Sequence, residues 1–115
     1  MTTVLIVDDY APFRDSARGL LESGGFDVVG EAEDGAAALR LVEEMRPEVA
    51  LLDVHMPDLD GFEVARRLAE LDAPPIVVLT SSRDDYAPLV EGSAAHAFVR
   101  KDALSAETLA AALAS

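Results

Sequence analysis

The sequence predicts an α/β domain in which a parallel five-stranded sheet carries helices on both faces, a doubly wound arrangement. Three observations indicate this class. Short runs rich in valine, isoleucine and leucine alternate along the chain with longer segments of helical periodicity. Several of these runs are apolar at successive positions, as expected for strands that are covered on both faces. The 115 residues, 50% of them hydrophobic, suffice for one packed core but not for two domains.

Five runs are predicted to be strands because apolar and β-branched residues dominate them and turn residues bound them. They comprise residues 3–7, 26–32, 49–52, 76–79 and 97–100. Right-handed crossovers restrict the ways in which such strands can be connected. Ligands of open parallel sheets bind in the crevice beyond the carboxyl ends of the strands, so we expect the functional site at that edge.

Helices are predicted between the strands and after the last one. The first has Pro12 in its first turn, where a missing N–H costs nothing, and Gly24 and Gly25 end it. Asp34 and Ser105 are candidate N-caps of the second and the last helix.

The third and fourth connections differ in how clearly they indicate a helix. The third shows apolar residues at helical spacing, namely Phe62, Ala65, Leu68 and Ala69. Residues 81–92 give the weakest helical pattern, because Pro88 would block or kink a helix that begins at Asp84. The chain is thus predicted to consist of five strand–helix units.

Composition excludes several classes of protein. The formal net charge is −13, whereas a nucleic-acid binder needs clustered lysine and arginine, and an anionic membrane would repel such a chain. The absence of cysteine excludes disulfides, thiol catalysis and cysteine-ligated zinc. No apolar run approaches the roughly 20 residues that span a bilayer, and the first residues lack a secretory signal. We therefore expect a soluble cytoplasmic protein.

Polar and charged residues follow four of the five predicted strands, where the carboxyl ends should meet. They are Asp8, Asp9, Asp53, Thr80 and Lys101. Two carboxylates about 4 Å apart repel by roughly 4 kcal/mol at an effective dielectric constant of about 20, so three gathered acids need protons or a cation. Oxygen ligands without sulfur or clustered imidazole suit Mg²⁺, which often bridges carboxylates to a phosphoryl group. The pattern favours a metal-assisted phosphoryl site.

Each of these residues taken alone has a plainer interpretation. A single acid can be a loop carboxylate or a helix cap, and Lys101 could be an ordinary exposed lysine. Competing motifs are missing, including the Rossmann G-x-G-x-x-G turn, the P-loop and the G-x-S-x-G nucleophile elbow. His55 and His96 lack the spacing of a metal-binding pair, although His55 is close enough to Asp53 to border the site.

Taken together, the motifs resemble the receiver domain of two-component response regulators over essentially the whole chain. The matching segments are residues 4–9 (VLIVDD), 34–35 (DG), 51–61 (LLDVHMPDLDG), 79–81 (LTS) and 98–102 (FVRKD). An acidic pair, a D-x-x-M-P-x-x-x-G loop, a threonine and a lysine form a highly specific combination. Residues 28–32 (VVGEA) also resemble the NarL/LuxR-type subgroup.

The resemblance implies a flavodoxin-like fold with strand order 2-1-3-4-5. It implies that Asp53 is the phosphoacceptor, which takes a phosphoryl group from the phosphohistidine of a sensor histidine kinase. It also implies that Mg²⁺, or Mn²⁺ as a substitute, is held by Asp8, Asp9, Asp53 and the backbone carbonyl of His55.

Further residues have roles that the resemblance implies. Lys101 would contact the acyl phosphate, and Thr80 would donate its hydroxyl to a phosphoryl oxygen. Phe98 matches an aromatic switch position whose ring repacks as Thr80 moves, and Met56 and Pro57 would shape the loop after the acceptor. Phosphorylation would then bias a two-state element of the fold.

The resemblance also bears on organisation and partners. It implies a single receiver domain over residues 1–115, with no output domain in this chain and no direct DNA binding by the domain itself. A homodimer could form through the fourth helix, the fifth strand and the fifth helix, although Pro88 should leave the fourth helix short or irregular.

Three functions are compatible with these residues. The favoured one is a phosphorylation-controlled switch that is no conventional enzyme and catalyses only its own phosphoryl acceptance and slow dephosphorylation. A small hydrolase or phosphatase with Asp53 as its nucleophile is the second, although the chain offers no element to define an external substrate. A purely structural interaction domain is the third, although crowded acids without a cation would only destabilise its fold.

Overall fold

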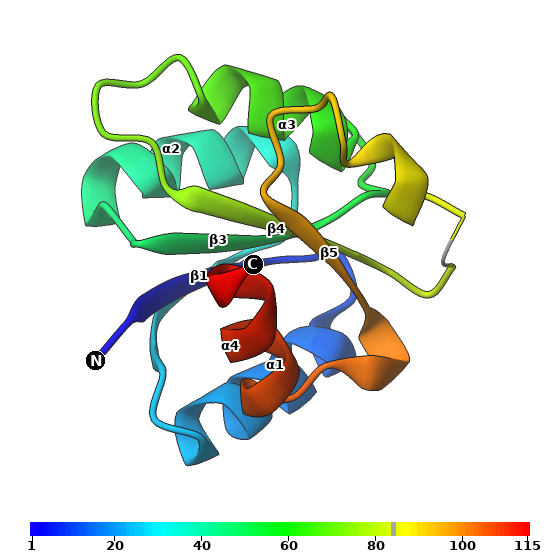
Figure 1. The fold of residues 1–115 in the computed structure, drawn as a ribbon. Helices are drawn as coiled ribbons and strands as arrows, with labels where there is room; N and C mark the ends of the chain where they lie inside the picture. The colour runs from blue at the N-terminus through cyan, green and yellow to red at the C-terminus, as the bar shows by residue number, and fades with distance from the viewer. Residues whose placement is uncertain (84) are drawn as a thin grey trace.

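The computed structural model describes residues 1–83 and 85–115 and contains a parallel sheet in the order β2-β1-β3-β4-β5 (Figure 1). The strands are β1 (Thr3–Val7), β2 (Asp27–Ala32), β3 (Val49–Asp53), β4 (Ile76–Ser81) and β5 (Ala97–Arg100). The helices are α1 (Ala11–Ser23), α2 (Gly35–Met45), α3 (Gly61–Leu68) and α4 (Ala106–Ala114), with 3-10 turns η1 (Ala87–Leu89) and η2 (Lys101–Ala103). This confirms the predicted doubly wound, flavodoxin-like fold. None of the helices in the described part of the chain is long and apolar enough to cross a membrane.

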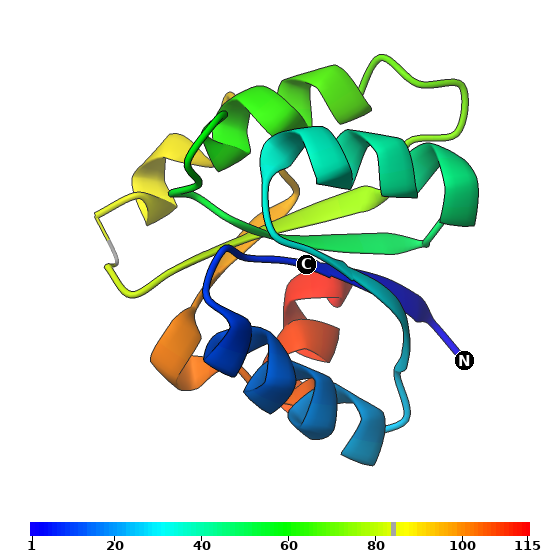
Figure 2. The ribbon, with the colours of Figure 1, turned by 180° about the vertical axis from the view of Figure 1, so that it is seen from behind.

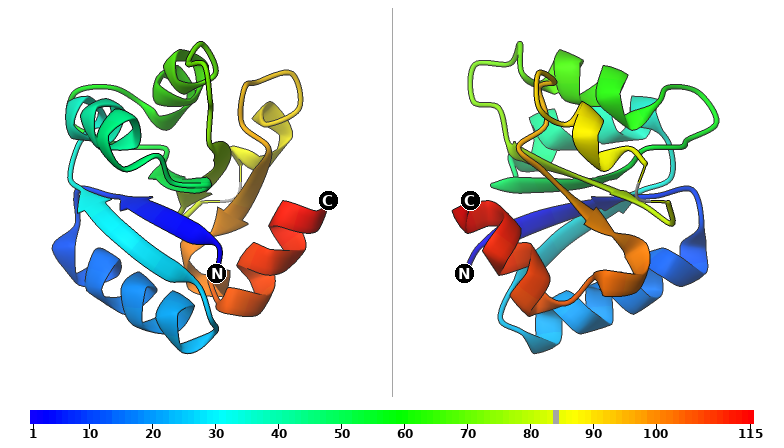
Figure 3. Two further views of the ribbon diagram at one scale, coloured as in Figure 1. Left: turned by 90° about the vertical axis from the view of Figure 1, so that its left-hand side faces the viewer. Right: turned by 45° about the vertical axis from the view of Figure 1, so that its right-hand side comes forward.

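The sheet separates two helical layers. Helices α2 and α3 cover one face and α1 and α4 the other, as the front and back views show (Figures 1 and 2). The side views show the three layers most clearly (Figure 3). Along β1, Leu5 and Val7 belong to the buried cluster under α2 and α3, whereas Val4 and Ile6 belong to the cluster over α1 and α4. This double burial explains why the strand is apolar at successive positions.

Short-range sequence signals fix the starts of the helices. Pro12 lies in the first turn of α1, as predicted. Asp34, Asp60 and Ser105 are the N-caps of α2, α3 and α4, and each side chain accepts a hydrogen bond from the third helical N–H at 2.8–3.0 Å. The predicted caps at Asp34 and Ser105 are therefore confirmed, and Asp60 adds a third.

The expected fourth helix is wrong as a full element, because a single 3-10 turn, η1, occupies its place between β4 and β5. The last N–H of this turn donates to the Tyr86 carbonyl at 3.0 Å. Pro88 supplies no N–H to continue the ladder, and Gly92 adopts a left-handed φ of +88° soon afterwards. The irregularity expected from Pro88 is thus confirmed, while Asp84, the expected helix start, lies outside the described residues.

Strands β3 and β4 extend further than predicted, and this extension places two polar residues side by side. Asp53 is the last residue of β3 and pairs in register with Thr80 on β4. Both side chains are buried. The functional residues therefore begin inside the sheet rather than in the loops beyond it.

The packing of α1 on α4 can be tested at two glycines, Gly19 within α1 and Gly24 at its C-cap. A Cβ on Gly24 would lie 2.0 Å from the Cβ of Ala106 on α4, whereas a Cβ on Gly19 meets nothing within 4 Å. Gly24→Ala is expected to lower the free energy of unfolding by about 1–3 kcal/mol through overpacking. Gly19→Ala is expected to raise it by about 0.5–1 kcal/mol through helix propensity. Urea denaturation measures both, and equal shifts in the two variants would contradict this packing of α1 on α4.

Candidate functional site

Three carboxylates converge at the carboxyl edge of the sheet. Asp8 and Asp9 follow β1, and Asp53 ends β3, the neighbour of β1. One oxygen from each of the three residues lies within 4.8 Å of the others. Asp8 and Asp53 are buried and Asp9 is exposed. The predicted convergence of these acids is confirmed, and two of them lie where solvent screens them little.

Lys101 provides the positive charge of the cluster. It is the first residue of η2, directly after β5, and its Nζ lies 2.6 Å from Asp8 Oδ2 and 3.4 Å from Asp53 Oδ2. The ring of Phe13, in the first turn of α1, lies under the ammonium with its centroid 4.7 Å from Nζ. The aromatic face attracts the cation and limits where the flexible stem can place it.

Lys101 only partly compensates the negative charge. Burial and the charge of Asp8 raise the pKa of the Asp53 carboxyl to about 6, and the contacts of that carboxyl with Lys101 and the His55 N–H limit the rise. The His55 N–H lies 3.4 Å from Asp53 Oδ1, which makes it a weak donor. The folded protein therefore holds Asp53 ready to ionise near neutral pH, at a cost that a bound cation would remove.

The donor set fits Mg²⁺. Asp8 Oδ2 is buried and, apart from its ion pair with Lys101, accepts no hydrogen bond from the described residues. All three acids offer hard oxygen ligands, the type that Mg²⁺ prefers. Oxygens around one octahedral Mg²⁺ lie about 3–4 Å apart, so small side-chain movements suffice to close the observed spacing of up to 4.8 Å.

Thr80 and Phe98 occupy neighbouring places on β4 and β5. The Thr80 hydroxyl is buried and donates to the Leu52 carbonyl at a long 3.3 Å. Phe98 pairs in register with Leu79 and is partly buried against the cluster under α2 and α3. Thr80 thus lies beside Asp53, whereas Phe98 lies one strand further out with its ring toward the core.

The loop after β3 is tied to α2. Asp58 accepts hydrogen bonds from the N–H groups of Gly35 at 2.8 Å and Ala36 at 3.0 Å, which lower the pKa of its carboxyl. Met56 is partly buried against the core, and Pro57 is exposed. The N-terminus of α2 therefore holds this loop in place, and the predicted loop residues lie beside the site rather than among its carboxylates.

A tight approach next to the end of β3 explains the glycine of the loop. A Cβ on Gly61 would lie 2.6 Å from the Asp53 carbonyl oxygen. The Gly61 N–H donates to the Val54 carbonyl at 2.8 Å, so α3 begins almost in contact with the end of β3. Any larger residue would push this loop away from the site.

Sequence reasoning missed three residues that border the site. Phe13 is an apolar residue of α1, and helical spacing says nothing of its contact with Lys101. Arg14 donates from Nη1 to the Asp8 carbonyl at 2.5 Å. Tyr86 bonds through its hydroxyl to His55 Nε2, joining the two connections that flank the site. Each contact joins separate elements, so no local spacing could have indicated it.

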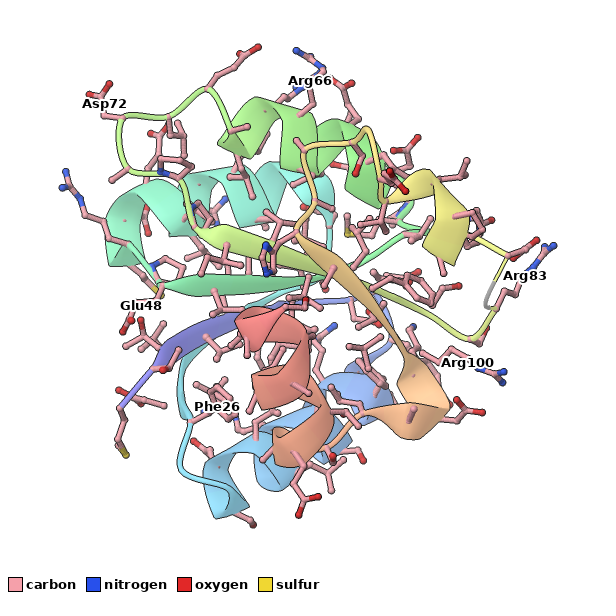
Figure 4. The ribbon with its side chains drawn as sticks, viewed as in Figure 1. Phe26, Glu48, Arg66, Asp72, Arg83 and Arg100 are labelled. Carbon is pink, nitrogen blue, oxygen red and sulfur yellow. The ribbon has the colours of Figure 1, made fainter. Side chains whose placement is uncertain are left out.

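Two arginines mark the outer rim of this edge. Arg83 and Arg100 extend outward at the end of the sheet where the strands finish (Figure 4). Arg83 pairs with Asp85 at 2.5 Å and Arg100 with Asp102 at 2.8 Å, both in exposed positions. Among the described residues, Lys101 is therefore the cation that contacts the carboxylates of Asp8 and Asp53.

Comparison with known proteins supports one family. A family model described as the response regulator receiver domain matches residues 4–114. The "Probable transcriptional regulatory protein NarL" of Mycobacterium tuberculosis (strain ATCC 25618 / H37Rv) is 42% identical over 115 residues, which cover 96% of this chain and 52% of that protein. A protein-glutamate methylesterase/protein-glutamine glutaminase of Hahella chejuensis is 48% identical over 79 residues, which cover 69% of this chain and 23% of that protein. The chain therefore spans about half or less of these relatives.

A solved structure agrees with this similarity. The signal receiver domain of NarL from Mycobacterium tuberculosis superposes with a TM-score of 0.88 at 38% sequence identity. The superposition covers 98% of this chain and 94% of that one. The likeness thus includes the whole sheet and the helices on both of its faces.

The electrostatics of the site make Asp53→Asn a stability test. Because the pKa of Asp53 is raised to about 6 in the folded state, its ionisation costs stability, and this cost grows as the pH rises from about 4 to above 6. The asparagine carries no charge, so in EDTA at about pH 7.5 the variant should gain about 1–3 kcal/mol in unfolding free energy. At about pH 4 the gain should approach zero.

Urea denaturation at the two pH values measures this difference. Saturating Mg²⁺ should remove or reverse it, because the ion stabilises the wild-type carboxylates more than the amide. A variant no more stable than the wild type in EDTA at about pH 7.5 would contradict the electrostatic account of the cluster.

Proposed function

The chain belongs to the response regulator receiver domain family, of NarL/LuxR type, and from this premise we propose that it is a signalling switch controlled by phosphorylation of Asp53. One observation carries the proposal. A buried carboxylate with its pKa raised to about 6 lies within reach of two further acids and of a lysine ammonium, all at the edge of the sheet where ligands bind. This arrangement suits a nucleophile in a phosphoryl transfer better than a structural acid.

The proposed reaction is transfer from a phosphohistidine of a sensor histidine kinase. An Asp53 oxygen attacks phosphorus, a P–O bond forms, and the P–N bond breaks with its electron pair going to that nitrogen. The imidazole already carries a proton on its other ring nitrogen and leaves neutral. Mg²⁺, or Mn²⁺ in its place, would neutralise charge on the phosphoryl oxygens. Its proposed ligands are Asp8, Asp9, Asp53 and the His55 carbonyl. The protein's own part is to place the Asp53 carboxylate, which is ionised above its pKa of about 6, beside the Lys101 ammonium.

Lys101 and Thr80 are proposed to bind the phosphoryl group once it is attached. The Lys101 ammonium lies 3.4 Å from Asp53 Oδ2, so it can contact a phosphoryl oxygen there with little movement. The Thr80 hydroxyl makes a long hydrogen bond of 3.3 Å to the Leu52 carbonyl and can exchange it for a charge-assisted bond to the phosphoryl group. Phe98, on the strand next to Thr80, is proposed to repack when Thr80 shifts.

The partner-binding face is proposed to comprise η1, β5 and α4. An apolar hollow between these elements is lined by Ala87, Phe98, Val99 and Ala112, among others. We propose that a second copy of the chain can bind this face, with η1 in place of the expected fourth helix. Some longer relatives are named as transcriptional regulatory proteins, and in them phosphorylation of such a domain would control transcription. We do not propose that this acidic domain itself contacts DNA.

Phosphorylation can be tested directly. After incubation with Mg²⁺ and a small acyl-phosphate donor, the intact mass should increase by one phosphoryl group, and the adduct should be labile to hydroxylamine because it is an acyl phosphate. Asp53→Asn should abolish the increase. The matched control is Asp102→Asn, which removes an exposed acid beside Lys101 and should be phosphorylated as the wild type is.

Other outcomes would favour the other functions. Continuous turnover of a phosphate monoester that depends on Asp53 would favour a hydrolase. An unchanged mass together with no Mg²⁺ binding would favour a structural domain and would overturn the switch.

A further inference from the structure

We propose that Arg14 is a positioning residue that holds the peptide between Asp8 and Asp9 in the orientation required for Mg²⁺ binding. The inference rests on the proposed function, because it concerns the same metal site. Arg14 lies in α1, and 16% of its side chain is exposed. It carries a full positive charge close to the acidic cluster, yet none of its hydrogen bonds or ion pairs within the described part of the chain goes to a carboxylate of that cluster.

The guanidinium instead links the end of β1 to β2. Its Nη1 donates to the Asp8 carbonyl at 2.5 Å, and its Nε donates to Glu31 Oε1 on β2 at 3.1 Å. The other oxygen of Glu31 accepts from Arg18 Nε at 2.8 Å. Glu31 is therefore fixed from two sides, and the rigid fork of Arg14 transmits that fixed position to the Asp8 carbonyl.

This carbonyl matters because its peptide unit leads into Asp9. The peptide group is planar, so fixing the Asp8 carbonyl oxygen also fixes the direction in which the chain enters Asp9. Asp8 itself is well held, since its N–H donates to the Ala32 carbonyl at 3.0 Å and its Oδ1 accepts from the Tyr10 N–H at 2.9 Å. The Asp8 carbonyl oxygen, which belongs to the peptide that leads into Asp9, is held by the Arg14 guanidinium.

Asp9 is the least constrained of the three acids. Its side chain is exposed, and within the described residues its carboxylate makes no hydrogen bond or ion pair. Whether it reaches a metal shared with Asp8 and Asp53 therefore depends on its backbone. Arg14 would therefore act on a bound Mg²⁺ through Asp9, because it contacts the Asp8 carbonyl and not the Asp9 carboxylate.

The charge of Arg14 and its hydrogen bonds have opposite effects on Mg²⁺ affinity. As a nearby cation, Arg14 repels Mg²⁺, so removing it should tighten binding if charge alone matters. As a positioning residue it preorganises a ligand, and loss of such outer contacts costs metal sites about 10–100-fold in affinity. The sign of the change therefore separates the two roles.

The experiment measures Mg²⁺ binding to the full chain without any phosphoryl donor, by isothermal titration calorimetry and by NMR shifts of the Asp9 amide. Arg14→Leu should raise the Mg²⁺ dissociation constant about tenfold. Arg14→Lys keeps the charge but lacks the fork, so it should also weaken binding. Phosphorylation rates should fall at low Mg²⁺ and recover at saturating Mg²⁺, because the reacting groups are intact.

Arg18→Leu is the matched control. It removes the same charge from the same helix and breaks another ion pair of Glu31, but Arg18 makes no contact with Asp8. Its Mg²⁺ dissociation constant should rise clearly less than that of Arg14→Leu, because Arg14 keeps both its ion pair with Glu31 and its bond to the Asp8 carbonyl. Thermal unfolding in EDTA should show all three variants folded at the titration temperature, and a variant that fails this test is replaced by Arg14→Gln.

The outcomes distinguish this inference from the proposed function. Wild-type Mg²⁺ binding that depends on Asp53, together with unchanged or tighter binding by Arg14→Leu, would overturn the role of Arg14 and leave the proposed function standing. An Arg14→Lys variant that binds as the wild type does would also overturn it, since charge without the fork would then suffice. A wild type that binds no Mg²⁺ would overturn both.

Discussion

Three carboxylates, two of them buried, share one edge of the sheet with the Lys101 ammonium. Their mutual repulsion is the constraint that governs this site. Such a cluster is unfavourable unless it gains positive charge, since burial and the charge of Asp8 raise the pKa of Asp53 despite the nearby Lys101. A fold that kept this arrangement for stability would do better with apolar side chains. Under the proposed function, a bound cation followed by an anionic group would offset this cost, and charge compensation would then differ between the states of the molecule.

The topology brings these charges together without any special loop. The order β2-β1-β3-β4-β5 makes the strands that carry the acids direct neighbours, and β4 and β5 follow in sequence on one side. Parallel strands all end at the same edge, so the residues at the ends of β1, β3, β4 and β5 together build the site. The helices then hold the intervening loops through Asp34 and Asp60 as caps and through Asp58 on the N-terminus of α2. Most side chains of the site are thus positioned by backbone that the core already fixes.

Much of this could be predicted from the sequence because the determining interactions are local or periodic. Strand β1, apolar at successive positions, and the caps at Asp34 and Ser105 follow from short-range rules, and the acids were placed by the ends of strands. The helix expected after β4 failed because Pro88 and Gly92 act together, and only the tertiary structure decides how a short connection closes. The sequence could not predict that Phe13 contacts Lys101 or that Arg14 contacts Asp8. The periodicity of α1 identifies its buried face but not the residues that this face contacts at the sheet edge.

The support of the site is uneven, and this bears on where a response to phosphorylation can occur. On the side of α1 and α2, the loops after β1 and β3 are held by Arg14, by Asp58 and by the close approach of Gly61 to Asp53. On the other side, η1 contributes no buried residue, and Leu89 is 57% exposed. On that side, the Tyr86 hydroxyl and His55 Nε2 form a hydrogen bond between the connection after β4 and the loop after β3. Segments with few buried contacts rearrange at the lowest cost. If Asp53 is phosphorylated as proposed, the change should therefore be absorbed at η1 and the connections around it, while the side held by Arg14 and Asp58 keeps its geometry.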